Sequence, residues 1–377
     1  MAWVCFVMLG VMGSGPDASV LQFPALLVNN TPTGGDVGAH VLMPQILRDV
    51  LLPSGLISGW SDSWFAGFPA FYFYFPIPMM VATLFGFFLP TGVALKIVIS
   101  AGVVAMPLVT YFFVRGMGIE RIVAAVAASG SAAFVLMESY DIFGGNIISR
   151  LAGEFSFSWS LALGILYLGL IARETRIGDH FSVWPGVTLA LCTLSHVVTT
   201  IVVVFITIPW LFRKSSFRAV AGSWAVGFGI SAFWSIPFAV RLFQGMTTDM
   251  RWAPVTGLVG SEGMLPADLA FAVPLGAAGL VWCVVRRDRI GLLGGLLAVP
   301  VVGYLVLARI GVGILNNGRL LPYWYLGVFI FAGIAVGRGV AYLADLRSDR
   351  RGALARYAFA AVVLVILSTA VSMSDVT

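Results

Sequence analysis

The chain has 377 residues, of which 59% are hydrophobic and only 10% are charged. A soluble domain carries about a quarter charged residues, so this chain has too much apolar surface to bury in one core. The chain as a whole is therefore not a soluble enzyme, a nucleic-acid-binding protein or a disordered protein. The net charge of +5 does not change this conclusion. The composition predicts a multi-pass membrane protein whose main surroundings are the lipid bilayer, with no nucleic-acid partner.

The N-terminal part is less uniformly apolar than the rest. Residues 1–12 are apolar but too short to cross a bilayer, which takes about 20 residues. We expect residues 13–70 to form an outer loop and residues 71–377 a helix bundle, together a single transmembrane domain. Within the loop, residues 43–52 predict a short amphipathic helix at the membrane interface, with Ile46, Leu47, Val50 and Leu51 opposite Arg48 and Asp49.

Apolar runs follow one another along the remaining chain and predict an all-α, polytopic transmembrane bundle of about 10–12 spans. Residues 182–212 are too long for one crossing, and Ser195 and His196 interrupt them, so they predict two short helices. The other candidate spans are 71–88, 92–114, 122–137, 155–172, 219–241, 267–284, 290–307, 323–341 and 357–373.

The positions of Arg and Lys predict the orientation of these spans. Five short segments hold 15 of the 22 basic residues, and such loops lie on the cytoplasmic side. They are 115–121, 173–179, 213–218, 286–289 and 338–356. The intervening loops 138–154, 244–266 and 308–321 then face outward. This arrangement predicts a multi-pass protein of the bacterial cytoplasmic (inner) membrane.

The segment 71–88 leaves two alternatives open. If it crosses the membrane completely, residues 13–70 lie on the cytoplasmic side, away from the other outer loops. If it is re-entrant or lies on the surface, they lie outside. Pro69, Pro76 and Pro78 make an imperfect helix start, and we favour the outside placement.

The first polar loop holds an unusual acid. Asp36 lies among three glycines in the sequence TPTGGDVGAH, which ends at His40. The glycines let the backbone turn tightly and leave the carboxylate accessible to a bulky ligand. Trp60, Trp64 and the aromatic run 71–75 follow. They indicate either an aromatic belt at the headgroup level or the wall of a lipid- or sugar-binding cleft.

A second polar cluster lies between two apolar helices and contains Glu138, Asp141, Arg150 and Glu154. Charges in such a place need a partner or water. Two interpretations stay open: Arg150 neutralises Glu154 four residues later, or the cluster faces the same cavity as Asp36.

Two further side chains are candidate ligand contacts. His196 is a titratable group at the break in an apolar run, although a lone histidine is often only a hydrogen-bonded core residue. Arg319 begins a late span beside Asn317, and its guanidinium suits phosphate oxygens at the bilayer surface. The alternative for Arg319 is an arginine that only anchors a helix end.

Several kinds of chemistry have no sequence support. The chain has no nucleotide-binding glycine loop, zinc-protease motif or nucleophile elbow in the required context. The three cysteines lie singly in apolar runs and suggest no metal site.

The motifs taken together resemble a family. The order Gly34-Gly35-Asp36, Gly38, His40, then the segment 59–69, is similar to bacterial integral membrane proteins labelled "6-pyruvoyl-tetrahydropterin synthase-related". The segments 145–158, 195–196 and 317–322 fit the same pattern, so the resemblance spans about residues 31–330.

The layout also resembles the C-type membrane glycosyltransferases, which have an essential acid in the first outer loop and a lipid-phosphate-sugar donor. This resemblance implies that Asp36 is the general base or orients the acceptor, and that Arg319 and His196 hold the phosphate of a polyprenyl-phosphate leaving group. The other expected substrate-binding residues are His40, Glu138, Asp141, Glu154, Asn317, Trp60 and Trp64. No cofactor is certain, a divalent cation is left open, and no residues are assigned to a metal.

The leading hypothesis is therefore a membrane glycosyltransferase that moves a sugar from a polyprenyl-phosphate-linked donor to a cell-envelope glycan or lipid acceptor at the outer face. Two other functions use the same features. One is a transporter or flippase of a lipid-linked sugar, and the other is a non-catalytic subunit of an envelope-assembly complex.

Overall fold

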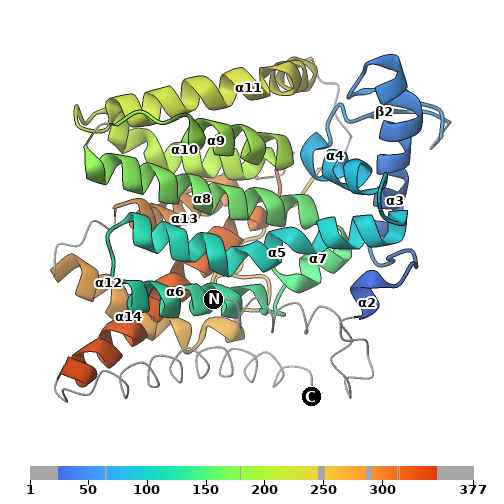
Figure 1. Ribbon diagram of the computed structural model, residues 1–377. Helices are drawn as coiled ribbons and strands as arrows, with labels where there is room; N and C mark the ends of the chain where they lie inside the picture. The colour runs from blue at the N-terminus through green and yellow to red at the C-terminus, as the bar shows by residue number, and fades with distance from the viewer. Residues whose placement is uncertain are drawn as a thin grey trace.

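The computed structural model describes residues 24–63, 66–178, 180–244, 251–285, 291–311, 313 and 315–345. Residues 1–12, Trp64 and the predicted span 357–373 lie outside these ranges. The described part is a bundle of long apolar helices, as the sequence predicts (Figure 1). The main helices are α5 (Thr91–Gly116), α6 (Arg121–Val135), α8 (Phe155–Ile177), α9 (Val183–Ser195), α10 (Val197–Leu211), α11 (Phe217–Phe243), α12 (Ala272–Val285), α13 (Gly291–Ile310) and α14 (Leu321–Asp345).

The helices differ in length and in how much of their surface the protein covers. Five helices in the described ranges are long and apolar enough to cross a membrane: α5, α8, α11, α13 and the helix that includes α14. α4, α6, α9, α10 and α12 are apolar but shorter. α8 and α14 are mostly buried, whereas α11 and α13 expose apolar side chains. In a bilayer protein such exposed apolar faces contact lipid.

The core is held by close approach of helix backbones. α5 packs along α8, and α14 packs against α6 and α12. A Cβ atom on Gly102 of α5 would lie 2.5 Å from the Ser158 carbonyl carbon of α8, and one on Gly333 of α14 would lie 2.6 Å from Ala127 Cα of α6. Small residues at these crossings are typical of membrane helices, because their association depends on van der Waals packing.

The break predicted inside 182–212 is confirmed. α9 ends at Ser195, His196 is extended (φ −172°, ψ 122°), and α10 begins at Val197. The His196 side chain caps α10, since its Nδ1 accepts a hydrogen bond from the Val198 N–H at 3.4 Å. The break therefore places a histidine side chain where two helix ends meet.

The described basic segments meet at one end of the bundle, on the left in Figure 1. Met117, Arg176 and Arg213 come from three of them and line one cavity together with Gly291, the first residue of α13. Arg338 of α14 also forms an ion pair with Glu120, which precedes α6. This arrangement agrees with the prediction that these segments share one side of the membrane.

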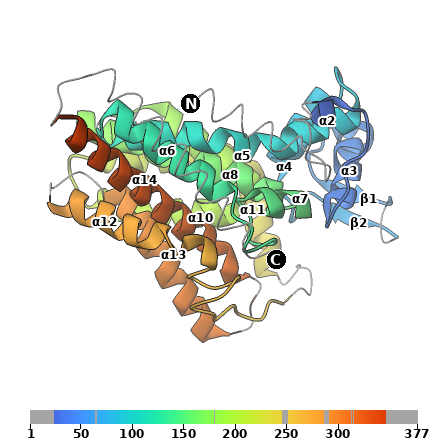
Figure 2. The same cartoon turned by 90° about the horizontal axis from the view of Figure 1, so that it is seen from below.

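The N-terminal elements form a cap on the opposite end of the bundle (Figure 2). They are α2 (Pro24–Leu27), α3 (Val37–Ile46), a π turn (Leu47–Leu51), a 3-10 turn (Leu52–Ser54), the antiparallel strands β1 (Gly59–Ser61) and β2 (Phe68–Ala70), and α4 (Pro76–Phe85). The candidate span 71–88 is thus corrected. Its aromatic half is irregular, and α4 has 10 residues, about 15 Å, half of a hydrocarbon core.

The predicted amphipathic helix 43–52 also differs in detail. α3 begins six residues earlier, and the chain then widens into the π turn. Ile46, Leu47 and Leu51 are buried as expected, but Val50 is 45% exposed. A π turn has more residues per turn than an α-helix, so Val50 rotates away from the apolar face.

Candidate functional site

Asp36 lies where the cap meets the bundle, and its carboxylate is free. Its backbone N–H donates to the Ala152 carbonyl at 2.8 Å. Its side chain is exposed at the start of α3 and forms no hydrogen bond or ion pair with any described residue. Gly35 has φ +48°, and a Cβ there would lie 2.3 Å from the Ala152 oxygen. The glycine is therefore required for the close backbone contact that holds Asp36 in place.

His40 lies one turn further along α3 and is buried. Its Nε2 lies 2.9 Å from the Tyr74 hydroxyl, and its ring meets Phe155 edge-on at 5.2 Å. Burial lowers the pKa of His40 from 6.5 to about 4, although the negative charge of Asp36 and a hydrogen bond with the Gly153 backbone act in the opposite direction. His40 is therefore neutral at pH 7, and it fixes Tyr74 beside the Asp36 loop.

Glu154 and Arg319 form a bidentate ion pair, although 165 residues separate them. Arg319 Nη1 donates to Glu154 Oε2 at 2.6 Å, and Nη2 donates to Oε1. The side chains are 22% and 16% exposed, so a ligand can still reach the pair. Glu154 precedes α8, and Arg319 lies in the 3-10 helix η4 (Asn317–Leu320) that leads into α14.

His196 completes this group from the break between α9 and α10. Its Nε2 lies 3.4 Å from Arg319 Nη1. The neutral ring carries its hydrogen on Nε2 when Nδ1 accepts from the Val198 N–H, and on Nδ1 when Nε2 accepts from Arg319 Nη1; in the first form Nε2 is a donor. Two hydrogen-bond donors, from His196 and Arg319, therefore converge on one place, which suits an anion.

Aromatic rings enclose the histidine. Phe75 lies 4.4 Å from the His196 ring and Phe157 5.2 Å from it, centroid to centroid. Trp234 of α11 stacks against Phe238 and donates its indole N–H to the Phe71 carbonyl at 2.8 Å. The aromatic run 71–75 is therefore an inner wall of the site.

The loop 138–154 is ordered by a buried amide. Asn146 donates to the Met137 and Tyr140 carbonyls, at 2.9 Å each, and caps α7 (Ile147–Ala152) by accepting from Ser149 N–H. Gly153, with φ +116°, ends α7 and lets Glu154 turn toward Arg319.

Arg150 does not neutralise Glu154, so that interpretation of the second cluster is wrong. Arg150 is buried, and its Nη1 donates to Ser100 Oγ of α5 at 2.7 Å. Burial lowers the pKa of Arg150 from 12.5 to about 10. Glu154 turns instead to Arg319, whose two Nη atoms donate to both carboxylate oxygens.

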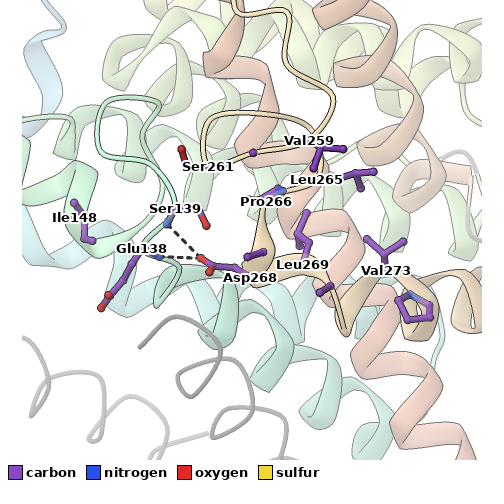
Figure 3. A pocket seen from close by; sticks show the side chains of 14 residues that line it. Glu138, Ser139, Ile148, Val259, Ser261, Leu265, Pro266, Asp268, Leu269 and Val273 are labelled. Carbon is purple, nitrogen blue, oxygen red and sulfur yellow. Dashed lines mark hydrogen bonds between the residues drawn. The ribbon is translucent and has the colours of Figure 1, made fainter. Parts of the chain in front are cut away.

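Glu138 lines a second cavity, of about 910 Å³, to which Ile148 of α7 also contributes (Figure 3). The first cavity, lined by Arg176 and Arg213, lies at the basic end of the bundle. The buried Asp268 accepts hydrogen bonds from the Glu138 and Ser139 backbone N–H groups at 3.0 and 3.3 Å. Partial burial and the charge of Asp268 raise the pKa of Glu138. Apolar side chains such as Leu265, Leu269 and Val273 line the opposite wall.

The other predicted site residues lie apart from the Arg319 group. Asn317 is buried, and its amide is occupied by the Val255 backbone (2.8 Å to each group) and the Tyr304 carbonyl. Trp60 is 60% exposed, and its indole donates to Asp62. Asp141 is exposed on its loop. Trp64 lies outside the described residues.

The fold brings together five of the predicted residues: Asp36, His40, Glu154, His196 and Arg319. Tyr74 links them, because the charges of Glu154, Arg319 and Asp36 all act on its hydroxyl. No three His, Cys, Asp or Glu side chains in the described ranges are close enough to hold a metal ion.

Three residues of the site are not singled out in the sequence analysis. Tyr74 and Phe75 stand in the aromatic run, but only the fold shows that they face the histidines. Asp268 is a single acid before an apolar helix, and in the sequence only this position indicates that it has a role.

No family model matches the chain, and no curated protein sequence matches it. The name "6-pyruvoyl-tetrahydropterin synthase-related" therefore has no support beyond the resemblance of the motifs. Similarity appears instead among solved structures.

The apo oligosaccharyltransferase of Archaeoglobus fulgidus aligns over 98% of this chain and 55% of its own, with a TM-score of 0.64 and 13% identity. The same organism's AglB oligosaccharyltransferase, in complex with an inhibitory peptide and a dolichol-phosphate, aligns with a TM-score of 0.54 and 13% identity. This alignment covers 98% of the present chain and 56% of AglB. Apo ArnT of Cupriavidus metallidurans aligns with a TM-score of 0.55 and 14% identity, over 98% of the present chain and 75% of ArnT. The chain thus spans just over half the length of the archaeal enzymes, and its fold is that of the polytopic C-type membrane glycosyltransferases.

Proposed function

We propose that this protein is a membrane glycosyltransferase that moves a sugar from a polyprenyl-phosphate-linked donor to a cell-envelope glycan or lipid acceptor. The observation that carries the proposal is the pairing of two groups at one end of a C-type fold. One is the free carboxylate of Asp36, and the other is the pair of donors from Arg319 and His196. A base and an anion-binding group are what transfer from a sugar phosphate needs.

In this reaction the acceptor hydroxyl oxygen forms a bond to the anomeric carbon while the bond from that carbon to the phosphate oxygen breaks. Asp36 takes the hydroxyl proton. The phosphate leaves with the bonding electron pair, and its charge is stabilised by the Arg319 guanidinium and the His196 Nε2–H. His40 is neutral and buried, so it positions Tyr74 next to Asp36 rather than carrying the proton.

Glu154 occupies the fork of Arg319 in the ligand-free protein. A donor phosphate that binds this fork displaces the carboxylate, which then faces the acceptor. The partial exposure of both side chains supports this exchange, because the phosphate need not enter a closed core. The exchange keeps the guanidinium paired with an anion before and after binding.

The cavity beside Glu138 suits the acceptor. Its wall is largely apolar and one edge carries an acid, so it fits a glycolipid, with the lipid against Leu265 and Leu269 and a sugar hydroxyl near Glu138. We place this end of the bundle at the outer face of the bacterial inner membrane, because the opposite end carries the basic segments.

The test compares Asp36→Asn with Asp49→Asn. Asp49 lies in the same cap and is exposed, and among the described residues it pairs with the neighbouring Arg48. Purified protein in lipid nanodiscs is given a panel of synthetic polyprenyl-phosphate hexoses and pentoses with envelope lipid, and released polyprenyl phosphate is measured by mass spectrometry. We expect Asp36→Asn to release at least about a hundredfold less polyprenyl phosphate than the wild type, because this is the usual effect of losing a general base. Asp49→Asn should release as much as the wild type.

Equal release by the wild type and Asp36→Asn would overturn the proposed role of Asp36. Movement of the intact sugar lipid across the bilayer without release of phosphate would instead indicate a flippase. Wild-type protein that neither cleaves nor moves any donor in the panel would favour a non-catalytic subunit.

A further inference from the structure

The basic end of the bundle holds a cavity that the proposed reaction does not use. It has a volume of about 630 Å³ and lies between the ends of α5, α8 and α10 and the start of α13. This end is the left side in Figure 1, opposite to α3 and α4. Its volume is within the range of small-ligand sites.

The charged side chains that line this cavity are all positive in the described part of the chain. Arg176 and Arg213 line it, and none of its described lining residues is acidic. Neither arginine forms an ion pair with a described residue, whereas the nearby acids Glu120 and Glu174 are paired elsewhere, with Arg338 and His180. Two cations that line one cavity, with no acid among its described lining residues, attract an anion.

The polar groups in the cavity suit a phosphate. Arg213 lies over the Trp210 ring, 5.1 Å from its centroid, which limits the positions of the guanidinium. Ser215 and Ser216, which follow Arg213 in the chain, also line the cavity. Guanidinium and hydroxyl donors together form hydrogen bonds to phosphate oxygens.

The rim of the cavity points to a lipid rather than to a water-soluble phosphate. Ile177 lines it and is 62% exposed, and Phe212, next to Arg213, is 84% exposed. Phe217 is 52% exposed after the same turn. Apolar side chains exposed beside a basic pocket at the end of membrane helices match the acyl chains and headgroup of one lipid.

We propose that this cavity, lined by Arg176, Arg213 and Trp210, binds the phosphate headgroup of an anionic phospholipid. The lipid's acyl chains lie against Ile177, Phe212 and Phe217. The site lies at the end of the bundle opposite to Asp36, so it is separate from the proposed transfer site and does not depend on it.

The test measures lipid binding to delipidated full-length protein in a neutral detergent. Phosphatidylglycerol, phosphatidylcholine and soluble glycerol phosphate are titrated separately, and the shift in melting temperature is followed. The variant is Arg176→Gln/Arg213→Gln. The control Arg121→Gln/Arg173→Gln loses the same charge at the same end, because both arginines are exposed and neither lines the cavity.

We expect phosphatidylglycerol to raise the melting temperature of the wild type and of the control. The cavity variant should need about thirtyfold more of this lipid, the combined effect of two basic residues near a membrane surface. Equal dependence in both double variants would overturn the site. A full shift with glycerol phosphate alone would overturn the assignment to a lipid.

A second measurement avoids the variants. Wild-type protein is photolysed with phosphatidylglycerol that carries a photoreactive headgroup, and the labelled peptides are mapped. Labels within 172–178 or 210–217 support the proposal, and labels confined to other segments overturn it.

Discussion

The carboxylate of Glu154 meets the guanidinium of Arg319 through both of its oxygens, and this pair joins the start of α8 to the start of α14. The two helices are the most buried long helices of the described bundle. One ion pair therefore has two roles: it ties two central helices together, and it holds the arginine that we assign to the donor phosphate.

The structural role predicts strong coupling between the two charges. Glu154→Gln or Arg319→Gln alone leaves a partly buried charge without its partner, and each should lower the free energy of unfolding by about 2 kcal/mol. The double variant leaves no charge unpaired and should lose about 1 kcal/mol less than the sum of the single losses. Unfolding of the four proteins in mixed detergent micelles measures this coupling, and additive losses would contradict it.

The functional role predicts opposite effects of the two substitutions on phosphate binding. Glu154→Gln removes the carboxylate that competes for the fork, so the affinity for polyprenyl phosphate should rise about tenfold, and Arg319→Gln should weaken it by at least as much. Glu138→Gln, which removes an acid beside the second cavity, is the control and should leave the affinity unchanged. Binding is measured by native mass spectrometry. Weaker binding by Glu154→Gln would mean that the carboxylate supports the phosphate site.

His40 predicts a loss of stability at low pH. Its pKa is about 4 in the folded protein and 6.5 in the unfolded chain, so the unfolded chain binds the proton more tightly. The stabilisation is present above pH 6.5 and is lost as the pH falls from there toward 4. Between pH 7 and 5 the wild type should lose about 2 kcal/mol more than His40→Gln. Unfolding curves at the two pH values measure this difference, and parallel losses in both proteins would refute it.

The sequence was enough to predict the class of fold because the bilayer imposes simple rules on helix length and charge. The break at His196 was also predictable, since polar residues interrupt an apolar run that is too long for one span. The partner of Glu154, in contrast, could not be predicted from the sequence. At a spacing of four residues Arg150 is the obvious partner, but the turn at Gly153 directs Glu154 to an arginine 165 residues away. Local spacing contains no information on such a contact. The length of α4 was missed because hydropathy measures apolar character and does not show where an aromatic run stops being helical.

The glycines around Asp36 allow the position of the carboxylate to be tested without removing it. Gly35→Ala places a Cβ 2.3 Å from the Ala152 oxygen at φ +48°, so the Asp36 loop must move away from α7. We expect release of polyprenyl phosphate to fall at least about a hundredfold, because displacement by about 1 Å has effects of this size. Gly38→Ala is the matched control, since nothing lies within 4 Å of its Cβ and alanine favours the α3 helix. It should keep full activity and melt at the same or a higher temperature. If Gly35→Ala folds with wild-type activity, the placement of Asp36 against α7 does not matter for the reaction, and the base must be sought elsewhere.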